Sequence, residues 1–119
     1  MTPRRGEVWL ADFEPSVGDE VRKARPVLVI GRNGLCPLRL AIVCPIRTRK
    51  HAHNRYNWLI AVSPDANNGL NKASSVDSFQ VRCVSFKRMI RKIGELDEEK
   101  VATVAQAVAL CVGFQIKDH

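Results

Sequence analysis

A mainly β fold closed by one C-terminal helix is predicted by three features of the sequence. Short apolar runs rich in branched and aromatic residues recur between positions 7 and 84, which is typical of strands. Segments rich in Gly, Pro and Asn separate these runs, which is typical of turns. A helical spacing of apolar residues appears clearly only after position 97. Five or six short strands followed by one helix predict an α+β arrangement, a small twisted barrel of the SH3 type with the helix packed on it.

The first two strands are expected on either side of a long loop. Glu7–Phe13 combines aromatic and branched residues, as strands do. The polar stretch 14–24 that follows contains Pro15 and Gly18 and predicts a loop. Pro26 opens the apolar run PVLVI, and proline is tolerated at the first position of a strand. This run therefore predicts a second, buried strand.

Three further strands complete the expected sheet. Asn-Gly at positions 33 and 34 is a strong hairpin signal. A basic segment interrupts the apolar runs after position 46, and the turn-rich stretch PDANNGLNK interrupts them again after position 63. The remaining strands are expected at Leu38–Ile46, Trp58–Val62 and Ser75–Val84.

The C-terminal helix is predicted from its cap and its apolar spacing. Asp97 can cap the helix, and Glu98 and Glu99 stand in its first turn, where the helix dipole favours acids. Gly113 is suited to end it, and residues 93–96 predict a short last strand that leads into it. One face of the helix would carry the apolar residues Val101, Val104, Val108 and Cys111.

Positive charge is concentrated in one segment of the chain. The sequence has 19 Lys and Arg against 12 Asp and Glu, which gives a formal charge of +7. No acid occurs between Val21 and Pro64, and nine Lys and Arg fall there. The positive charge of this segment therefore exceeds the net charge of the whole chain. A folded surface with this much uncompensated charge repels itself, and a bound polyanion relieves the repulsion. Nucleic acid is therefore the first candidate ligand.

The composition also excludes several classes of protein. A content of 45% hydrophobic and 26% charged residues is ordinary for a globular domain, and we expect a single domain over residues 1–119. No apolar run approaches the roughly 20 residues of a membrane span, and no export signal is evident, so the cytoplasm is expected. The four cysteines lack the spacing of a zinc site, so neither a metal nor another cofactor is expected.

Several ordered motifs resemble one family. RRGEVWLADFEPSVGDEVRKARPVLVI is similar to the amino-terminal signature of the MazF/PemK toxins. IVCPIRTR resembles their third-strand motif, and SSVDSFQVRCVSFKRMIRKIGEL resembles their later block, so the similarity runs from Arg5 to Phe114. The resemblance implies an SH3-like barrel that forms a homodimer and is neutralised by a cognate antitoxin. It also implies a toxin that cuts single-stranded RNA at short sequences without a metal, inhibits translation, and leaves 5′-hydroxyl and 2′,3′-cyclic phosphate ends.

Arg25 is the first candidate catalytic residue, because the resemblance places the family's catalytic arginine in Ala24-Arg25-Pro26. Attack of a ribose 2′-hydroxyl on its phosphodiester builds negative charge on the phosphoryl oxygens, and a five-donor guanidinium suits these oxygens. Because the pKa of arginine lies above about 12, arginine is a poor base, so electrostatic stabilisation is its expected role. Glu20 matches a loop glutamate of the family and is the candidate proton acceptor. The alternative for Glu20 is membership of a solvated charge cluster.

The second catalytic residue of the family is a threonine or serine shortly after the proline of the third strand. Alignment on Pro45 puts Arg47 at that position and Thr48 one place later. Either the loop shifts by one residue so that Thr48 supplies the catalytic hydroxyl, or Arg47 takes its place as a second hydrogen-bond donor to the phosphate. A shift of one residue moves a strand side chain to the opposite face, so the two alternatives differ in geometry.

The basic loop and the later block supply the candidate contacts to RNA. If about four basic side chains neutralise phosphates, the logarithm of the binding constant should fall with the logarithm of the salt concentration with a slope of about −3. His51 and His53 could act as acid and base or contact phosphate, and Tyr56 and Trp58 could stack bases, although the core is favoured for Trp58. The candidate RNA-binding residues are Arg22, Lys23, Arg47, Arg49, Lys50, His51, His53, Arg55, Gln80 and Arg82.

Two other functions stay open. One is a barrel toxin of the same superfamily that poisons a protein target such as gyrase. The other is a degenerate relative that binds RNA without cutting it. The Arg25-Pro26 motif and the acid-free span favour the ribonuclease, while Arg47 at the usual hydroxyl position is the feature that favours the degenerate relative.

Overall fold

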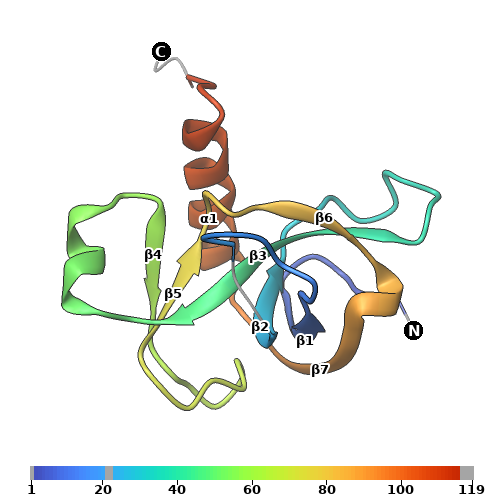
Figure 1. The fold of residues 1–119 in the computed structure, drawn as a ribbon, viewed down its shortest axis with the longest axis horizontal. Coiled ribbons are helices and arrows are strands. Elements are labelled where there is room, and N and C mark those ends of the chain that lie inside the picture. The colour runs from blue at the N-terminus through green and yellow to red at the C-terminus, as the bar shows by residue number, and fades with distance from the viewer. Residues whose placement is uncertain (1, 21–22, 116–119) are drawn as a thin grey trace.

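The computed structural model describes residues 2–20 and 23–115. Figure 1 shows a strongly curved sheet with one helix packed against it, which confirms the predicted mainly β class with a C-terminal helix. The strands are β1 (Glu7–Asp12), β2 (Ala24–Val29), β3 (Leu40–Thr48), β4 (Leu59–Val62), β5 (Ser74–Asp77), β6 (Arg82–Ser85) and β7 (Met89–Glu95). The helix is α1 (Glu98–Cys111), and the short 3-10 turns are η1 (His51–Arg55) and η2 (Phe86–Arg88).

The strand β3 joins the two parts of the sheet. The strands pair antiparallel in the order β4-β5-β3-β2-β1-β7, and β6 also pairs with β3. Along one edge β3 pairs first with β6, at Leu40–Val43, and then with β5, at Ile46–Thr48. Its other edge pairs with β2, where Val27 lies opposite Pro45. This division bends the sheet into a barrel-like shape.

Two apolar clusters lie on opposite faces of the curved sheet, because neighbouring side chains of a strand alternate in direction. In β1, for example, Val8 belongs to one cluster and Trp9 to the other. The cluster beneath α1 includes Val8, Leu28, Cys44, Ile46, Val76, Val101 and Val104. The second cluster includes Trp9, Phe13, Val27, Val43, Val84 and Met89.

The helix follows its prediction closely. The Asp97 carboxylate accepts a hydrogen bond from the Lys100 N–H at 2.8 Å, and Gly113 just past the helix has a φ of 82°. Val101 and Val104 are buried, and Val108 packs against the same cluster. Within residues 2–20 and 23–115, no helix is long and apolar enough to cross a membrane.

The predicted fifth strand over 75–84 is wrong, because the chain makes two strands there. β5 ends at Asp77, whose carboxylate oxygen Oδ1 accepts the N–H groups of Phe79 and Gln80 at 3.2 and 3.3 Å. These two hydrogen bonds turn the chain before β6 begins at Arg82. Two smaller differences are a ten-residue connection over 30–39 in place of a tight Asn-Gly hairpin, and a longer last strand, β7.

A close backbone crossing holds the segment 63–72 against β7. The Glu95 N–H donates to the Asn67 carbonyl at 2.8 Å. A Cβ atom on Gly69 would lie 2.1 Å from the Ile93 carbonyl oxygen, and one on Gly94 would lie 2.3 Å from the Asn68 carbonyl carbon. Only glycine permits this approach, so these two positions place the end of the segment, residues 70–72.

We predict that Gly69→Ala destabilises the protein far more than Gly34→Ala. The two glycines have nearly the same φ, 71° and 72°, so each substitution carries the same cost of about 1 kcal/mol for a left-handed alanine. A Cβ on Gly34 meets nothing within 4 Å, whereas one on Gly69 meets backbone. The clash should add about 2 kcal/mol to the loss in the free energy of unfolding, measured by urea denaturation. Equal losses for the two variants would show that the crossing is not tight.

Candidate active site

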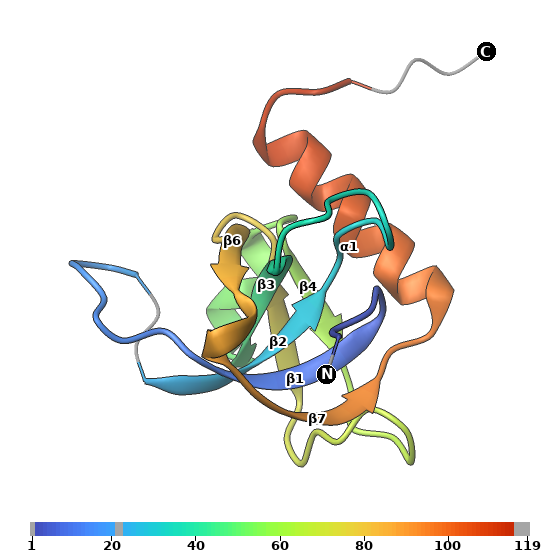
Figure 2. The same ribbon diagram turned by 90° about the vertical axis from the view of Figure 1, so that its right-hand side faces the viewer.

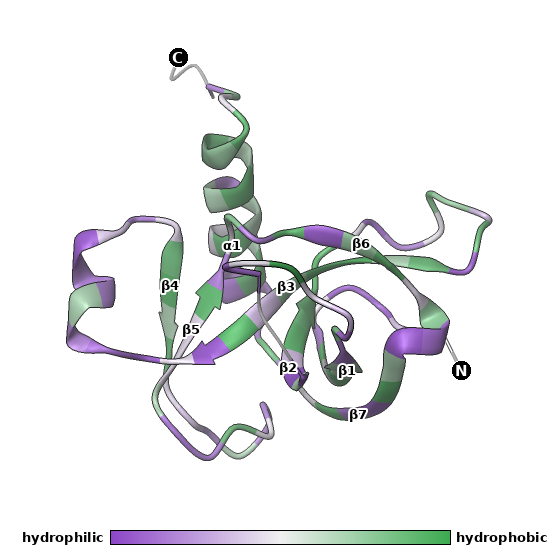
Figure 3. Cartoon of the chain, in the orientation of Figure 1, coloured by the Kyte–Doolittle hydropathy of each residue, from purple (hydrophilic) through white to green (hydrophobic). Residues whose placement is uncertain are grey.

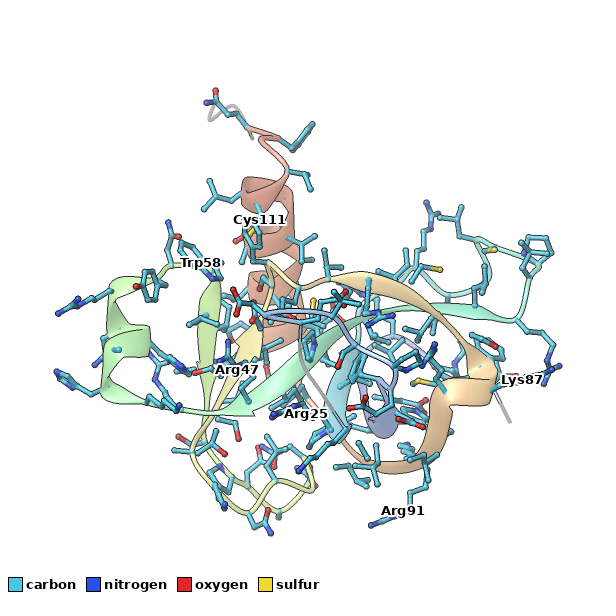
Figure 4. All side chains as sticks on the ribbon, viewed as in Figure 1. Arg25, Arg47, Trp58, Lys87, Arg91 and Cys111 are labelled. Carbon is cyan, nitrogen blue, oxygen red and sulfur yellow. The ribbon has the colours of Figure 1, made fainter. Side chains whose placement is uncertain are left out.

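A cavity of about 320 Å³ opens where the beginning of β2 meets the end of β3. The antiparallel register brings its residues together: the pairing of β2 with β3 ends at Val27 and Pro45, and the same register continued by two residues places Arg25 opposite Arg47. Figure 4 shows these two arginines on neighbouring strands. The cavity is lined by Lys23, Ala24, Arg25, Pro26, Ile46, Arg47, Thr48, Leu70, Asn71, Lys72 and Ser74.

Four of these lining residues carry positive charge: Lys23, Arg25, Arg47 and Lys72. Arg25 and Arg47 are half-buried, and the two lysines are exposed. No Asp or Glu lines the cavity among the described residues. Guanidinium groups bind phosphate oxygens with two parallel hydrogen bonds, so this arrangement can hold a phosphodiester.

Both candidates for the second catalytic position reach the cavity, from opposite faces of β3. Arg47 continues the face of Val43 and Pro45, and its Nη1 lies 3.3 Å from Asp77 Oδ2. Thr48 is exposed and pairs with Ser74. Both alternatives therefore meet the requirement of proximity to Arg25, but only Arg47 shares the face of the sheet on which Arg25 lies.

Asp77 belongs to the site and was not among the residues expected from the sequence. It is only 2% exposed and uses both carboxylate oxygens, one for Arg47 and one for the N–H groups of the following turn. A buried carboxylate needs such partners, because desolvation of an unpaired charge is costly. The pair holds the Arg47 guanidinium at the cavity. The available signal was an acid inside the strand predicted over 75–84.

Below the basic loop, a buried network connects η1 to β5. Arg49 donates to the Ser75 hydroxyl at 2.9 Å and to the Asn54 side-chain oxygen at 2.8 Å. His53 Nδ1 lies 2.9 Å from the same hydroxyl and accepts the Lys50 N–H at 3.3 Å. Because the Lys50 N–H donates to Nδ1, Nδ1 acts as an acceptor, and the proton of a neutral His53 ring then lies on Nε2.

His53 therefore organises the loop instead of facing solvent. The residue is only 6% exposed, so a bound RNA strand would touch its exposed neighbours and not His53. Lys50, His51 and Arg55 remain exposed on or beside η1. Figure 3 shows that the turn around η1 is largely hydrophilic, in contrast to β4.

The other candidates lie apart from the cavity or outside the description. The Glu20 carboxylate accepts the Val17 N–H at 2.6 Å in the loop between β1 and β2, which Figure 2 shows projecting from the barrel. Gln80 lies in the turn after β5, and the Arg82 guanidinium lies 5.1 Å from the centre of the Phe13 ring. Arg22 lies outside the described residues. Within the described residues, no group of three or more His, Cys, Asp or Glu is placed to hold a metal ion.

A barrel-like sheet with a cation-lined cavity at one end defines a class of small proteins suited to binding phosphodiesters. The chain belongs to the PemK-like, MazF-like toxins of type II toxin–antitoxin systems, because the model of that family matches residues 4–112.

Individual relatives agree with this assignment. The endoribonuclease EndoA of Bacillus subtilis is 30% identical over 118 residues, which cover 96% of this chain and 97% of that protein. Among solved structures, the Mycobacterium tuberculosis toxin MazF-mt6 is 25% identical, with a TM-score of 0.72 over 92% of this chain and 99% of that one. A mycobacterial endoribonuclease in complex with its cognate antitoxin has the same fold, with 16% identity and a TM-score of 0.75 over 98% of this chain and 100% of that one.

We predict that protonation of His53 destabilises the protein at acid pH. Burial lowers the pKa of His53 from 6.5, and the charges of Arg47, Arg49 and Lys50 lower it further. The unfolded chain therefore binds a proton at higher pH than the folded one, so this contribution to stability is present above about pH 6.5 and is lost as the pH falls below it. The melting temperature of His53→Gln should drop less between pH 7.5 and pH 5 than that of the wild type.

His51→Gln is the matched control, since His51 is exposed on the same turn. It should keep the pH dependence of the wild type. If His53→Gln kept that dependence in full as well, the buried network would not be the source of the pH effect.

Proposed function

We propose that this toxin is an endoribonuclease that cuts single-stranded RNA by attack of a ribose 2′-hydroxyl on the adjacent phosphodiester. The observation that carries the proposal is the cavity lined by Arg25, Arg47 and Thr48, which brings donors for a phosphate together and has no acid among its described lining residues. The names of the curated relatives support the same activity.

The chemistry assigned to these residues is electrostatic. As the 2′-oxygen attacks, charge builds up on the two non-bridging oxygens, and Arg25 and Arg47 donate to them. Asp77 keeps the Arg47 guanidinium at the cavity. Loss of the 5′-oxygen would leave a 2′,3′-cyclic phosphate and a 5′-hydroxyl end. This path needs no metal, because guanidinium groups supply the positive charge.

Glu20 is the candidate for taking the 2′-hydroxyl proton, but its carboxylate is engaged by the Val17 N–H. For this role the loop between β1 and β2 would have to carry Glu20 to the cavity. Lys23, at the end of the same loop, already lines it, with its N–H donating to the Glu14 carboxylate at 2.7 Å. The exposed bases Lys50, His51 and Arg55, with Arg49 and Gln80, would guide the strand towards the cavity.

The partners follow from the family and from the charge. We propose a homodimer that acts in the cytoplasm, inhibits translation, and is neutralised by an antitoxin with an acidic segment. A solved relative in complex with its cognate antitoxin supports the partner, and the formal charge of +7 suits an acidic one. The exposed residues Lys87 and Arg91 offer a second surface for it, beside Arg88, which donates to the Glu14 carbonyl, and Lys92, which pairs with Glu7 and Glu95.

The two other functions receive less support. Poisoning of a protein target needs no cavity lined by two guanidinium groups, and the Bacillus subtilis relative described above is named an endoribonuclease. A binder that does not cut would still use Arg47 and the basic loop. Analysis of RNA products separates these functions.

Arg25→Ala should abolish cleavage. The purified protein is incubated with a long single-stranded RNA in EDTA, and the ends of the products are analysed. We expect discrete cuts with 5′-hydroxyl ends, and a rate at least about 100-fold lower for Arg25→Ala, since the loss of one transition-state donor costs this much. Intact RNA with folded wild-type protein would contradict the ribonuclease, and loss of cutting in EDTA would contradict a metal-independent reaction.

Substitutions at Arg47 and Thr48 decide which residue is the second catalytic group. Because Arg47 shares the face of Arg25 and is held by Asp77, Arg47→Ala should lower kcat about 100-fold, and Thr48→Ala should lower it less than about 10-fold. Single-turnover rates at saturating RNA measure this. The reverse order would assign the role to Thr48.

A further inference from the structure

Three aromatic side chains form a continuous strip beside the basic loop. The ring centres of Tyr56 and Trp58 are 4.7 Å apart, and those of Trp58 and Phe79 are 5.9 Å apart. Tyr56 is 41% exposed and Phe79 is 63% exposed, while Trp58 is half-buried and not the core residue that the sequence favours. We call these three residues the aromatic strip. Grouped rings left in water on one patch point to a ligand.

Hydrogen bonds hold the backbone at or beside each residue of the aromatic strip. The Tyr56 N–H donates to the His53 carbonyl at 3.1 Å, and the Ser78 N–H donates to the Trp58 carbonyl at 3.0 Å. Phe79 is held by its N–H bond to Asp77. The backbone that carries the aromatic strip is therefore held before any ligand arrives, and the rings contact one another, which lowers the entropic cost of binding.

The surroundings of the aromatic strip are positively charged. Arg55 directly precedes Tyr56, and Arg49 and Lys50 stand at the start of the same turn. Residues 49–58 and 78–80 contain no acid, and the one acid next to them, Asp77, is buried and paired with Arg47. Aromatic faces bordered by Arg and Lys side chains are the features by which proteins bind single-stranded nucleic acid.

The aromatic strip and the cavity lie at opposite ends of β5. Ser74, the first residue of β5, lines the cavity, and Asp77, its last residue, begins the turn to Phe79. Three residue steps of about 3.3 Å separate them, so about 10 Å of strand lies between the two sites. Figure 4 shows Arg47 between Arg25 and Trp58. A single strand of a few nucleotides can span this path.

We propose that the aromatic strip stacks an unpaired base of the RNA, a short way along the strand from the phosphodiester held at Arg25. The inference rests on the proposed ribonuclease function and adds a base-binding subsite to it. Stacking accepts every base, so this subsite contributes affinity and places the strand without setting the cleavage sequence.

A second copy of the chain is the other occupant that an exposed aromatic patch could take. The local charge argues against it at this place, because a partner with the same positively charged segment would repel Arg49, Lys50 and Arg55. RNA has the opposite charge, so it is the occupant that the residues around the aromatic strip favour.

The test measures the affinity of the whole protein for two single strands of about eight nucleotides, a length within the usual range of such sites. One strand consists of 2′-O-methyl adenosine nucleotides, and it cannot be cut because the attacking 2′-hydroxyl is blocked. The other has the same backbone without bases. Phe79→Leu keeps apolar bulk but removes the ring, Phe79→Tyr keeps the ring, and Phe114→Leu is the matched control, since Phe114 is 64% exposed just beyond α1.

Phe79→Leu should bind the adenosine strand at least about 5-fold more weakly and the strand without bases unchanged, since one stacked base contributes about 1 to 3 kcal/mol, or about 5- to 140-fold. Phe79→Tyr and Phe114→Leu should bind both strands like the wild type. Equal effects of Phe79→Leu on both strands, or no effect, would overturn the subsite. A changed oligomeric mass of Phe79→Leu in sedimentation would also overturn it and assign the aromatic strip to a protein interface.

Cleavage of a long RNA by the same preparations separates the two proposals. Cutting by the wild type with no base-dependent effect of Phe79→Leu would refute the subsite alone. Wild-type protein that neither cuts RNA nor binds either strand would refute the ribonuclease and the subsite together.

Discussion

The pairing of β3 is the constraint on which the site depends. One edge of this nine-residue strand pairs first with β6 and then with β5, while its other edge pairs with β2. The sheet must bend where the partner changes, and the last residues of β3 then face the beginning of β2. Arg25, Arg47 and Thr48 therefore line one cavity although about 20 residues of chain separate the arginines. The backbone crossing at Gly69 and Gly94 positions residues 70–72, which form the remaining wall of the cavity.

The second constraint is the repulsion among the bases that the bent sheet brings together. Asp77 offsets part of it at Arg47, and Ser75 and Asn54 take the donors of Arg49. His53 joins this network in its neutral form, since another positive charge at that place would add to the repulsion. The cavity itself keeps its excess of positive charge, and an RNA phosphate is the group that can balance it.

In the proposed reaction, the cavity and the aromatic strip belong to one path for a single strand. Arg25 and Arg47 would hold a phosphodiester, and the exposed basic side chains of η1 would neutralise the neighbouring phosphates. Tyr56, Trp58 and Phe79 would hold a nucleobase. Asp77 connects the two ends of this path, because one carboxylate oxygen positions Arg47 and the other positions the turn that carries Phe79. A change at Asp77 would therefore disturb both.

The sequence by itself determined the fold class, the helix, most strand positions, the acid-free basic span and the family, because strand and helix periods, turn residues, caps and motifs are local signals. The choice of Arg25 as the first candidate catalytic residue followed from such a motif. Tertiary structure alone decided the burial of His53, the ion pair of Arg47 and the meeting of Phe79 with Trp58. Each of these depends on a pairing between residues far apart in the chain, such as Arg47 with Asp77 or His53 with Ser75, 30 and 22 positions apart. No local spacing encodes such pairings, because side chains take their partners from whatever the folded sheet brings beside them.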